Sequence, residues 1–415
     1  MNLIKTSILS SISTALSMLS GFIITKVIAV YVGPSGLAIV GQLQNFINLM
    51  MLVTGNLFKT GLVKYTAEYH ETSNSRLHDL WSSAIFLTII LNVIVFICLF
   101  FFSEKLTSFV LNDMTYEYVI ITFSFSLPFF VINSIFLSIL NGMGSVKKFV
   151  LINIFSSFVS LIFVSFMSLK YALSGALIAY ATSQSFVLFF TLIIIFKEHW
   201  FSVRSFFCYP KFSEISNLLR FSVITLSSIL ASNLTMMFIR DCIINNYSDV
   251  DAGYWQGIFT LSQVVLSLVT MSFSTYLLPK LSSLQDKILI AKEIDNAIKV
   301  IFPVALFLSS LMYLTRDIII LVLYSDDFYP MRDLFFWQML GNVIKILGWI
   351  YGYVLVSKGM VKYTVMTEIV FSLSWSMLTV IFLDKFGLIG TTYAYAINCL
   401  LHFFTMYMIF RFKVK

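Results

Sequence analysis

Long uncharged runs of Leu, Ile, Val, Phe and Ala recur along the whole chain and alternate with short polar segments. About 20 apolar residues cross a bilayer as a helix, so each run predicts one membrane span. Twelve spans are expected, at residues 8–31, 37–57, 80–103, 118–140, 149–169, 172–196, 217–239, 255–278, 297–315, 334–357, 364–383 and 387–410. The pattern therefore predicts an all-α polytopic membrane protein.

The first two spans contain a single charge. Lys26 is the only charged residue between Ser7 and Phe58, and the segment 33–36 (Gly-Pro-Ser-Gly) predicts a tight turn between the spans. Lys26 lies about seven residues, or ~10 Å of helix, below that turn. A cation there costs roughly 3 kcal/mol on insertion scales and tends to face a polar cavity. Lys26 is therefore a candidate to line a path for an anionic group, and snorkelling to the nearer surface is the alternative.

Lysine and arginine are distributed unevenly between the two sets of connections. Nineteen lie on the side that carries the N-terminus and six on the other, while Lys26 and Lys345 lie within spans. Cytoplasmic connections carry the excess of positive charge, so both termini are expected in the cytoplasm. The opposite connections are all short, and the longest cytoplasmic ones are amphipathic rather than domain-sized. Neither face therefore has room for a soluble catalytic domain.

An internal repeat is visible. The segment Leu173–Ala181 (Leu-Ser-Gly-x-x-x-Ala-Tyr-Ala) recurs as Leu388–Ala396 (Leu-Ile-Gly-x-x-x-Ala-Tyr-Ala), 215 residues later. The duplication relates spans 1–6 to spans 7–12, and an even number of spans makes the halves parallel repeats around a shared central site. We expect an N-lobe at 1–196, a cytoplasmic linker at 197–216 and a C-lobe at 217–415. This is the architecture of a transporter.

Composition supports a membrane protein and proposes no enzyme. The chain is 59% hydrophobic and only 11% charged, with a net charge of +7. No basic run or soluble domain suggests a nucleic-acid partner, and no signal-peptide cleavage site is evident. The four cysteines show no Cys-x-x-Cys spacing, so neither a metal site nor a disulfide framework is expected. Nucleophile and phosphate-loop motifs are absent from the sequence.

Two further basic residues are candidate binding groups. Lys345 lies at mid-depth in the span 334–357, where snorkelling is harder than for Lys26. Arg240 ends the seventh span and is the approximate counterpart of Lys26 in the repeat. An outer-interface arginine paired with Asp241 is an equally open interpretation of Arg240.

Acidic and titratable residues are scarce within the spans. Glu368 and His402 are the coupling candidates, although Glu368 could instead pair with Lys362, and a hydrogen-bonded core role is the alternative for His402. A pump for cationic drugs should line its cavity with acid, so an anionic substrate is favoured. No cofactor is expected; protons, sodium or the membrane potential are the candidate driving forces.

Amide and aromatic side chains accompany the cations, as a sugar ligand would require. The candidates are Gln42, Trp255, Gln256, Trp337 and Gln338. Amides hydrogen-bond sugar hydroxyls and aromatic rings stack on pyranose faces. The alternative is that most Trp and Tyr residues form the interfacial belt of a membrane protein.

Several short motifs together resemble the Wzx flippases of the multidrug/oligosaccharidyl-lipid/polysaccharide exporter superfamily, and most closely the type that flips lipid III of enterobacterial common antigen. They are Lys26 with Gly33-Pro34-x-Gly36-Leu37, Lys64-Tyr65-x-Ala67-x-Tyr69-His70, Trp255-Gln256-Gly257, Ser272-Phe273-Ser274-x-Tyr276-Leu277-Leu278-Pro279, Arg316-Asp317, Met331-Arg332-Asp333-Leu334-Phe335-x-Trp337-Gln338 and Lys345. The motifs are spread over most of the chain, while spans three to six match only in pattern.

The resemblance implies two six-helix lobes around a cationic central cavity in the bacterial inner membrane. It implies transfer of an undecaprenyl-pyrophosphate-linked oligosaccharide to the periplasmic leaflet, with Lys26, Lys64 and Lys345 among the residues that hold the cargo. Asn342 stands where this family type is expected to have an acid, so an O-antigen repeat unit is favoured over the common-antigen unit. Membrane lipids, a polysaccharide polymerase and a chain-length regulator are the expected partners.

Two other functions compete with this interpretation. A membrane-embedded polysaccharide polymerase has a similar length, but it should carry a large periplasmic loop with basic catalytic residues, and no such loop is expected in this sequence. A small-molecule antiporter of the same superfamily should have more acid within its spans.

Overall fold

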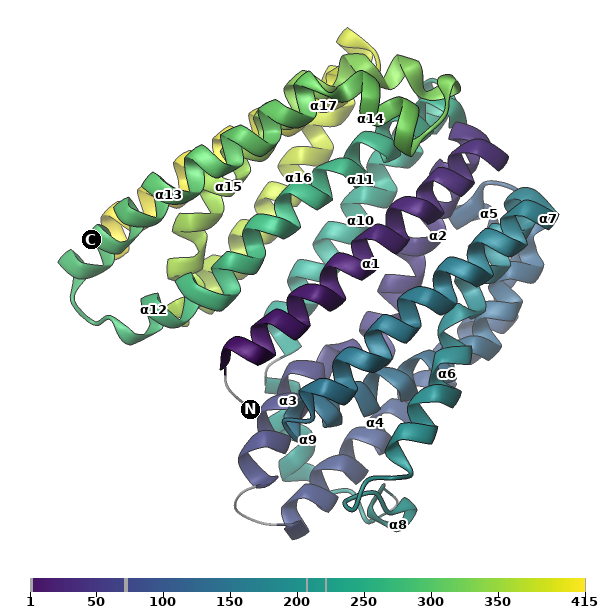
Figure 1. Cartoon of the computed structure of the whole chain (residues 1–415), viewed down its shortest axis with the longest axis vertical. Coiled ribbons are helices and arrows are strands. Elements are labelled where there is room, and N and C mark those ends of the chain that lie inside the picture. Colours follow the sequence, from purple (N-terminus) through teal and green to yellow (C-terminus); the bar gives the residue numbers. More distant parts are fainter. Residues whose placement is uncertain (1–2, 71–73, 207, 221, 415) are drawn as a thin grey trace. The chain divides into compact units, whose positions relative to one another are not determined.

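The computed structural model describes residues 3–70, 74–206, 208–220 and 222–414, and every element in these ranges is helical (Figure 1). The long helices are α1 (Leu3–Tyr31), α2 (Gly33–Thr54), α4 (Asn74–Phe101), α6 (Glu117–Gly142), α7 (Val146–Ile195), α10 (Ser222–Asn246), α11 (Asp249–Ser272), α13 (Lys287–Leu314), α15 (Phe335–Ser357), α16 (Val361–Phe386) and α17 (Ile389–Ile409). Shorter helices are α3 (Lys59–His70), α5 (Ser103–Leu111), α8 (Val203–Phe206), α9 (Phe212–Arg220), α12 (Leu278–Ser283) and α14 (Arg316–Leu323). The 3-10 segments are η1 (Asn56–Phe58), η2 (Met114–Tyr116) and η4 (Asp326–Leu334), and the π-helical segments are η3 (Phe273–Leu277) and η5 (Phe410–Val414).

Each predicted span corresponds to a helix or to part of one. Ten of the described helices are long and apolar enough to cross a membrane. The 50 residues of α7 contain two of the predicted spans, because Ala172 interrupts the helix with φ 48° and ψ −129°. The 24 residues of α11 occupy most of the predicted eighth span. The prediction of an all-α chain with twelve membrane helices is confirmed.

Several helix starts differ from the predicted boundaries, and two of them have a clear local cause. We expected the segment 33–36 to form a loop between the first two spans. Instead, α2 already begins at Gly33, and Pro34 lies in the first turn of this helix. Proline is well tolerated there because the first helical N–H groups have no intrahelical acceptor. Gly33 supplies the reversal alone through its φ of 83°. At the other site, α13 begins at Lys287, before the predicted 297, because its first turns are polar and extend the helix beyond the apolar run.

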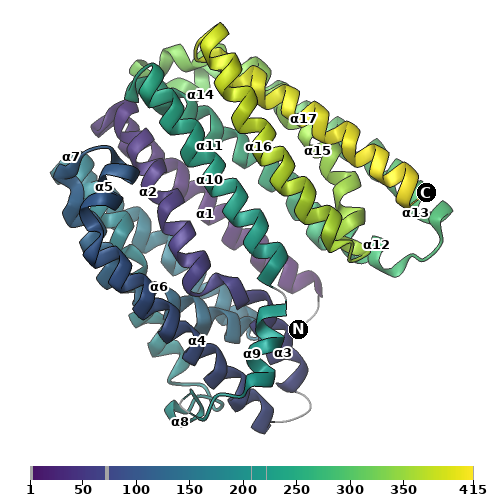
Figure 2. The same cartoon turned by 180° about the vertical axis from the view of Figure 1, so that it is seen from behind.

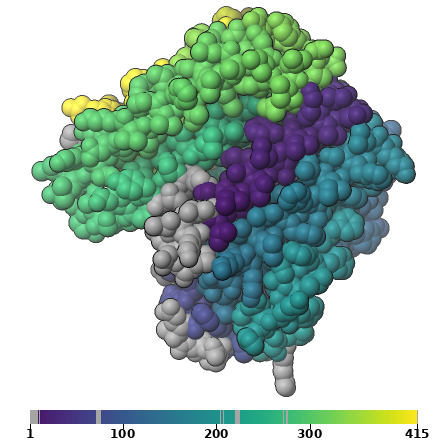
Figure 3. All heavy atoms as spheres, in the orientation of Figure 1, coloured from purple at the N-terminus to yellow at the C-terminus, as the bar shows by residue number. Residues whose placement is uncertain are grey.

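The chain forms two compact units. The N-terminal unit contains Met1–Val32 and Val40–Asn233, and the C-terminal unit contains Gly33–Ile39 and Leu234–Lys415. Within the N-terminal unit, α1 and α6 both pack on α7, and the space-filling view shows the purple atoms of α1 against later residues of the same unit (Figure 3). Within the C-terminal unit, α17 packs on α15 and α16 (Figure 2). The lobe boundaries at 196 and 217 stay a prediction.

The segment predicted as a linker, 197–216, is partly helical. It contains α8 and the start of α9, and α9 packs on α3 and α4. The Tyr69 hydroxyl donates to the Glu214 carboxylate at 3.2 Å, and Lys211 pairs with Asp79 at 2.6 Å. Burial and the neighbouring carboxylate raise the pKa of Tyr69 above its ordinary value. α9 is therefore part of the N-terminal unit.

The turn that follows the fourth and tenth predicted spans supports the internal repeat. Gly144 and Gly359, 215 residues apart, have φ angles of 67° and 65°. The N–H of the next residue, Ser145 or Met360, donates to a carbonyl five residues earlier at 2.9 Å in both copies. A left-handed residue of this kind needs glycine, since a side chain would crowd the carbonyl.

The turn before the sixth and twelfth spans is repeated as well. Ala172 and Gly387, again 215 residues apart, both have positive φ, 48° and 70°. A Cβ atom placed on Gly175 or Gly390 would lie 2.0 Å from the carbonyl oxygen of the residue eight positions earlier in each copy. The shared sequence Gly-x-x-x-Ala-Tyr-Ala thus encodes a close helix–helix approach in both halves.

The orientation of the chain in the membrane can be tested with reporter fusions. We expect a reporter fused after Lys170 to signal the periplasm and one fused after Lys415 to signal the cytoplasm, because the excess of positive charge belongs on the cytoplasmic side. Alkaline phosphatase and green fluorescent protein fusions give opposite signals on the two sides. Reversed signals would contradict the predicted topology.

Candidate functional site

Lys345 lies at the middle of α15 with its ammonium among three aromatic rings, the Lys345 cage. Its Nζ atom is 5.2 Å from the ring centre of Trp349, 5.3 Å from that of Tyr395 and 6.0 Å from that of Trp375. Such contacts stabilise a desolvated cation by up to about 2 kcal/mol each. Within the described ranges, no carboxylate forms an ion pair with Lys345. The cage therefore holds the cation without neutralising it.

Glycines on α15 allow α17 to approach closely enough to build this cage. A Cβ atom on Gly341 would lie 2.5 Å from the Tyr395 ring, and one on Gly348 would lie 2.7 Å from Nδ1 of His402. The seven-residue spacing of the two glycines places them on one face of the helix. Small residues in an interface are known to let membrane helices approach closely. The sequence could have indicated a closely packed face of α15 in this way, but not that Tyr395 lies against it.

Asn342 connects three helices next to the cage. It is fully buried; its amide donates to Ser262 Oγ of α11 at 3.1 Å, and its Oδ1 atom accepts from the Tyr395 hydroxyl of α17 at 2.9 Å. A carboxylate only accepts hydrogen bonds when it is ionised, whereas an amide does both. The surroundings of Asn342 therefore suit the amide present in this chain, and they add no negative charge beside Lys345.

Polar residues continue along the same face of α15. Gln338, Asn342, Lys345 and Trp349 follow one another at helical spacing. Gln338 is only 2% exposed, and its Nε2 atom has no hydrogen-bond partner in the part of the chain that the structure describes. Buried donors are nearly always satisfied, so Gln338 retains a hydrogen bond to offer to a water or a polar ligand.

Trp337 lies at the start of α15 but not on the face that carries Gln338 and Lys345. It is half-buried, and its ring meets that of Tyr393 edge to face with centres 5.0 Å apart.

Arg240 and Trp255 lie in the interior of the C-terminal unit. Each is only 1% exposed, the guanidinium lies 5.6 Å from the Trp255 ring, and Arg240 donates to Oε1 of Gln256. α10 continues past Arg240 to Asn246, so the residue does not end its span as expected. Asp241, the partner considered from the sequence, accepts from Asn245 at 3.1 Å.

The two coupling candidates have different surroundings. Glu368 is exposed on α16. His402 is half-buried on α17, where it faces Gly348 and meets the Phe371 ring edge to face at 4.9 Å. These two contacts of His402 are apolar, and the coupling role of either residue stays a prediction.

Three predicted site residues belong to the N-terminal unit. Lys26 is half-buried on α1, Gln42 is buried on α2 and Lys64 is exposed on α3. The Lys64 ammonium lies 4.9 Å from the ring centre of Tyr65, the next residue in the chain. Their roles stay predictions, as do those of the residues in the C-terminal unit.

Sequence comparisons match this chain to proteins of polysaccharide biosynthesis and to flippases. A family model described as polysaccharide biosynthesis protein matches residues 3–285. The lipid III flippase of Escherichia coli (strain K12) is 24% identical over 413 residues, which cover 97% of this chain and 97% of that protein. The lipid III flippase of Shigella flexneri matches with the same identity and coverage.

Solved structures show the same fold. A multidrug resistance MATE family transporter of the MOP superfamily, in an inward-facing conformation, matches with a TM-score of 0.78 and 16% identity over 96% of this chain and 94% of that one. The lipid II flippase MurJ, in an inward closed conformation, matches with a TM-score of 0.74 and 18% identity over 98% and 87% of the two chains. The chain therefore has the fold of these membrane transporters.

Proposed function

Because this chain belongs to the polysaccharide biosynthesis protein family, we propose that it flips an oligosaccharide linked to undecaprenyl pyrophosphate from the cytoplasmic to the periplasmic leaflet of the bacterial inner membrane. Alternating access of two lobes moves the cargo. The first cargo candidate is an O-antigen repeat unit. The many membrane helices and the relatives named as flippases over 97% of the chain support this proposal.

The observation that carries the proposal is the Lys345 cage. A pyrophosphate that leaves water loses several kcal/mol of solvation or more unless it is paired with positive charge. Lys345 offers such a charge at mid-depth, because no carboxylate in the described ranges neutralises it. The aromatic faces hold the ammonium by weaker contacts that an anion can replace. Gln338, on the same helix face, adds a donor for a sugar hydroxyl or a phosphate oxygen.

Lys26 is the second cation in this mechanism. It lies in the half of its span that we expect near the periplasm, whereas Lys345 lies at mid-depth, so the two offer positive charge at different depths. Lysine suits such a handover, since it is a point charge on a flexible stem and binds phosphate without a rigid bidentate geometry. Protons, sodium or the membrane potential supply the driving force, with Glu368 and His402 as the coupling candidates.

A second cargo candidate is the lipid III unit of enterobacterial common antigen. It is favoured by the names of the two relatives that match almost the full chain. An identity of 24% leaves room for a different glycan on the same scaffold. The class of cargo is the same in both cases: an anionic lipid carrier with a short oligosaccharide.

The cargo can be identified by deleting the gene and analysing lipid-linked glycans. We expect O-antigen units on undecaprenyl pyrophosphate to accumulate in the cytoplasmic leaflet, because synthesis continues while transfer stops. Lectin or antibody labelling of inside-out vesicles, followed by mass spectrometry, measures this. Accumulation of the common-antigen unit would favour the second cargo, and accumulation of neither would contradict the proposed function.

A further inference from the structure

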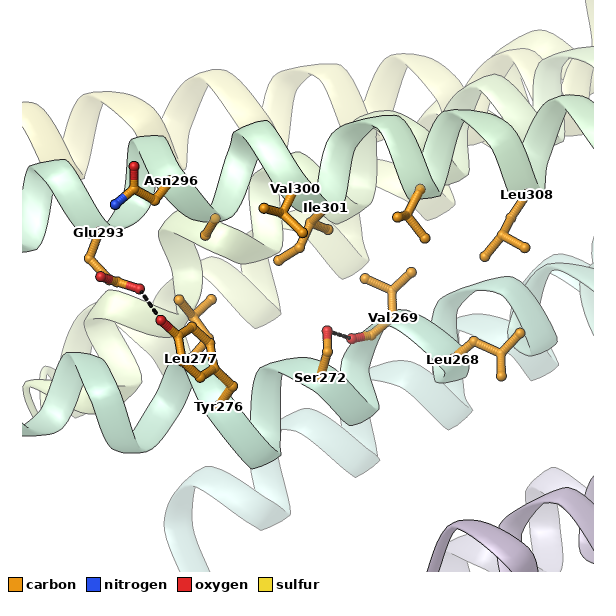
Figure 4. A pocket seen from close by; sticks show the side chains of 12 residues that line it. Leu268, Val269, Ser272, Tyr276, Leu277, Glu293, Asn296, Val300, Ile301 and Leu308 are labelled. Atoms are coloured by element: carbon orange, nitrogen blue, oxygen red, sulfur yellow. Dashed lines mark hydrogen bonds between the residues drawn. The ribbon is translucent and has the colours of Figure 1, made fainter. Parts of the chain in front are cut away.

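An open groove lies between two helices of the C-terminal unit, and none of the residues of the Lys345 cage lines it. It has a volume of about 530 Å³ and is formed by α11, η3 and α13 (Figure 4). Most of its wall is aliphatic, with Leu268, Val269, Val300, Val304 and Leu308 among the lining residues. Several of these side chains are about half exposed or more, so the described chain leaves the groove uncovered.

The groove has one polar end, made of Tyr276, Glu293 and Asn296. The Tyr276 hydroxyl donates to Oε1 of Glu293 at 2.9 Å (Figure 4). This bond uses one of about four acceptor positions of the carboxylate, which leaves the others available for a donor. None of the described residues that line the groove is a lysine or arginine. The polar end is therefore an acceptor-rich site for a positively charged donor.

The dimensions of the groove match one leaflet of a bilayer. Glu293 and Leu308 are separated by about 22 Å along α13, at 1.5 Å per residue. Half of the hydrocarbon core measures about 15 Å, and the interfacial region adds a few ångströms more. With the predicted orientation, the polar end lies at the cytoplasmic surface and the aliphatic end lies near the bilayer centre.

We propose that this α11–α13 groove binds one zwitterionic phospholipid with a primary ammonium head group, of the phosphatidylethanolamine type, from the cytoplasmic leaflet. The ammonium donates to Glu293, and one acyl chain lies along the aliphatic wall. The lipid-linked cargo is excluded, because its pyrophosphate would face the Glu293 carboxylate. The bound lipid bridges α13 and the π-helical segment η3, so its occupancy stabilises this arrangement by mass action.

The N-terminal unit offers a matched control. Its apolar groove between α4, α6 and the end of α7 has a volume of about 280 Å³ and is lined by Ile89, at the position equivalent to Val304 in the repeat. The two side chains have similar exposure, 49% for Ile89 and 48% for Val304. Among the side chains that the structure describes, no charged residue lines this second groove, so we expect no head-group preference there.

Native mass spectrometry of the purified full-length chain tests the proposal. The probes are dioleoyl phosphatidylethanolamine, phosphatidylcholine and phosphatidylglycerol, which share acyl chains and differ in the head group. We expect one ethanolamine lipid to bind about tenfold more tightly than either of the others, the ratio typical of a charge-assisted hydrogen bond. Glu293→Gln should remove the preference, and Val304→Trp should remove this binding event. Ile89→Trp should change neither the preference for the ethanolamine lipid nor its binding.

Three outcomes would overturn the proposal. The first is equal affinity for the three lipids, and the second is an unchanged preference in the Glu293→Gln protein. The third is a dimer of this chain that the Val304→Trp substitution dissociates, because a second copy would then be the occupant of the groove. Melting temperatures of the variants without lipid confirm that each one is folded.

Discussion

Replacing Lys345 with alanine is expected to stop export of surface polysaccharide while leaving the amount of protein in the membrane unchanged. The substitution removes the cation that we propose for the pyrophosphate, and a hydrogen bond to a charged group contributes about 1.5–3 kcal/mol, or roughly 10- to 100-fold in affinity. The substitution also removes the three ring contacts, but it relieves the cost of holding a cation in the middle of a span. No ion pair of Lys345 within the described ranges is broken, so the protein should remain folded. Silver-stained polysaccharide ladders and quantitative immunoblots of membranes, at native expression, measure both quantities.

Substitutions with different charge separate the role of the cation from that of the side chain. Arginine at 345 should retain more export than alanine, because a guanidinium also stacks on aromatic rings and binds phosphate. Glutamate should retain none. Lys26→Ala should lower export less than Lys345→Ala, since Lys26 lies nearer the membrane surface. Lys362→Ala is the matched control, because this lysine is exposed at the start of α16. Normal export by both Lys26→Ala and Lys345→Ala would refute the cationic mechanism.

Much of the fold could be predicted from the sequence because a bilayer imposes a simple rule. Backbone polar groups in hydrocarbon must be satisfied within the segment, so a long apolar run becomes a helix. Both turns of the internal repeat were also encoded locally, by Gly144 and Gly359 and by the motifs around Gly175 and Gly390. Helix ends were harder to predict. Hydropathy does not detect a helix where it extends into polar residues, as at the start of α13. It also does not show that a proline can lie in the first turn of a helix, as in α2.

The candidate site was only partly visible in the sequence. Lys345 stood out because a charge in a long apolar run is unusual, and Trp349 follows it at the spacing of one helical turn. Trp375 and Tyr395 lie on two other helices, and only helix packing brings them to the same ammonium. The burial of Arg240 was hidden for a similar reason. Hydropathy locates a residue along a span, but it does not tell which face of that helix packs inside the unit.

The last prediction concerns the glycines of the repeat. Gly175→Ala and Gly390→Ala should each reduce the amount of folded protein in the membrane and lower the melting temperature by about 5 °C or more. The added Cβ atom would lie 2.0 Å from the carbonyl oxygen of Met167 or Phe382, a distance that requires the two backbones to separate. Overpacking of this kind commonly costs about 1–3 kcal/mol, and more where the neighbour is backbone rather than a side chain that can rotate.

Gly21→Ala is the matched control for this pair, because no atom lies within 4 Å of the position where its Cβ would be built. In a helix that substitution should be neutral or stabilising by up to about 1 kcal/mol. Fluorescence-detected size-exclusion chromatography and thermal unfolding in detergent measure the three proteins side by side. The expected result is loss at both repeat positions and none at Gly21, in contrast to Lys345→Ala, where the protein remains and transport fails. Wild-type levels and melting temperature for Gly390→Ala would show that the close approach in the second repeat is not required for folding.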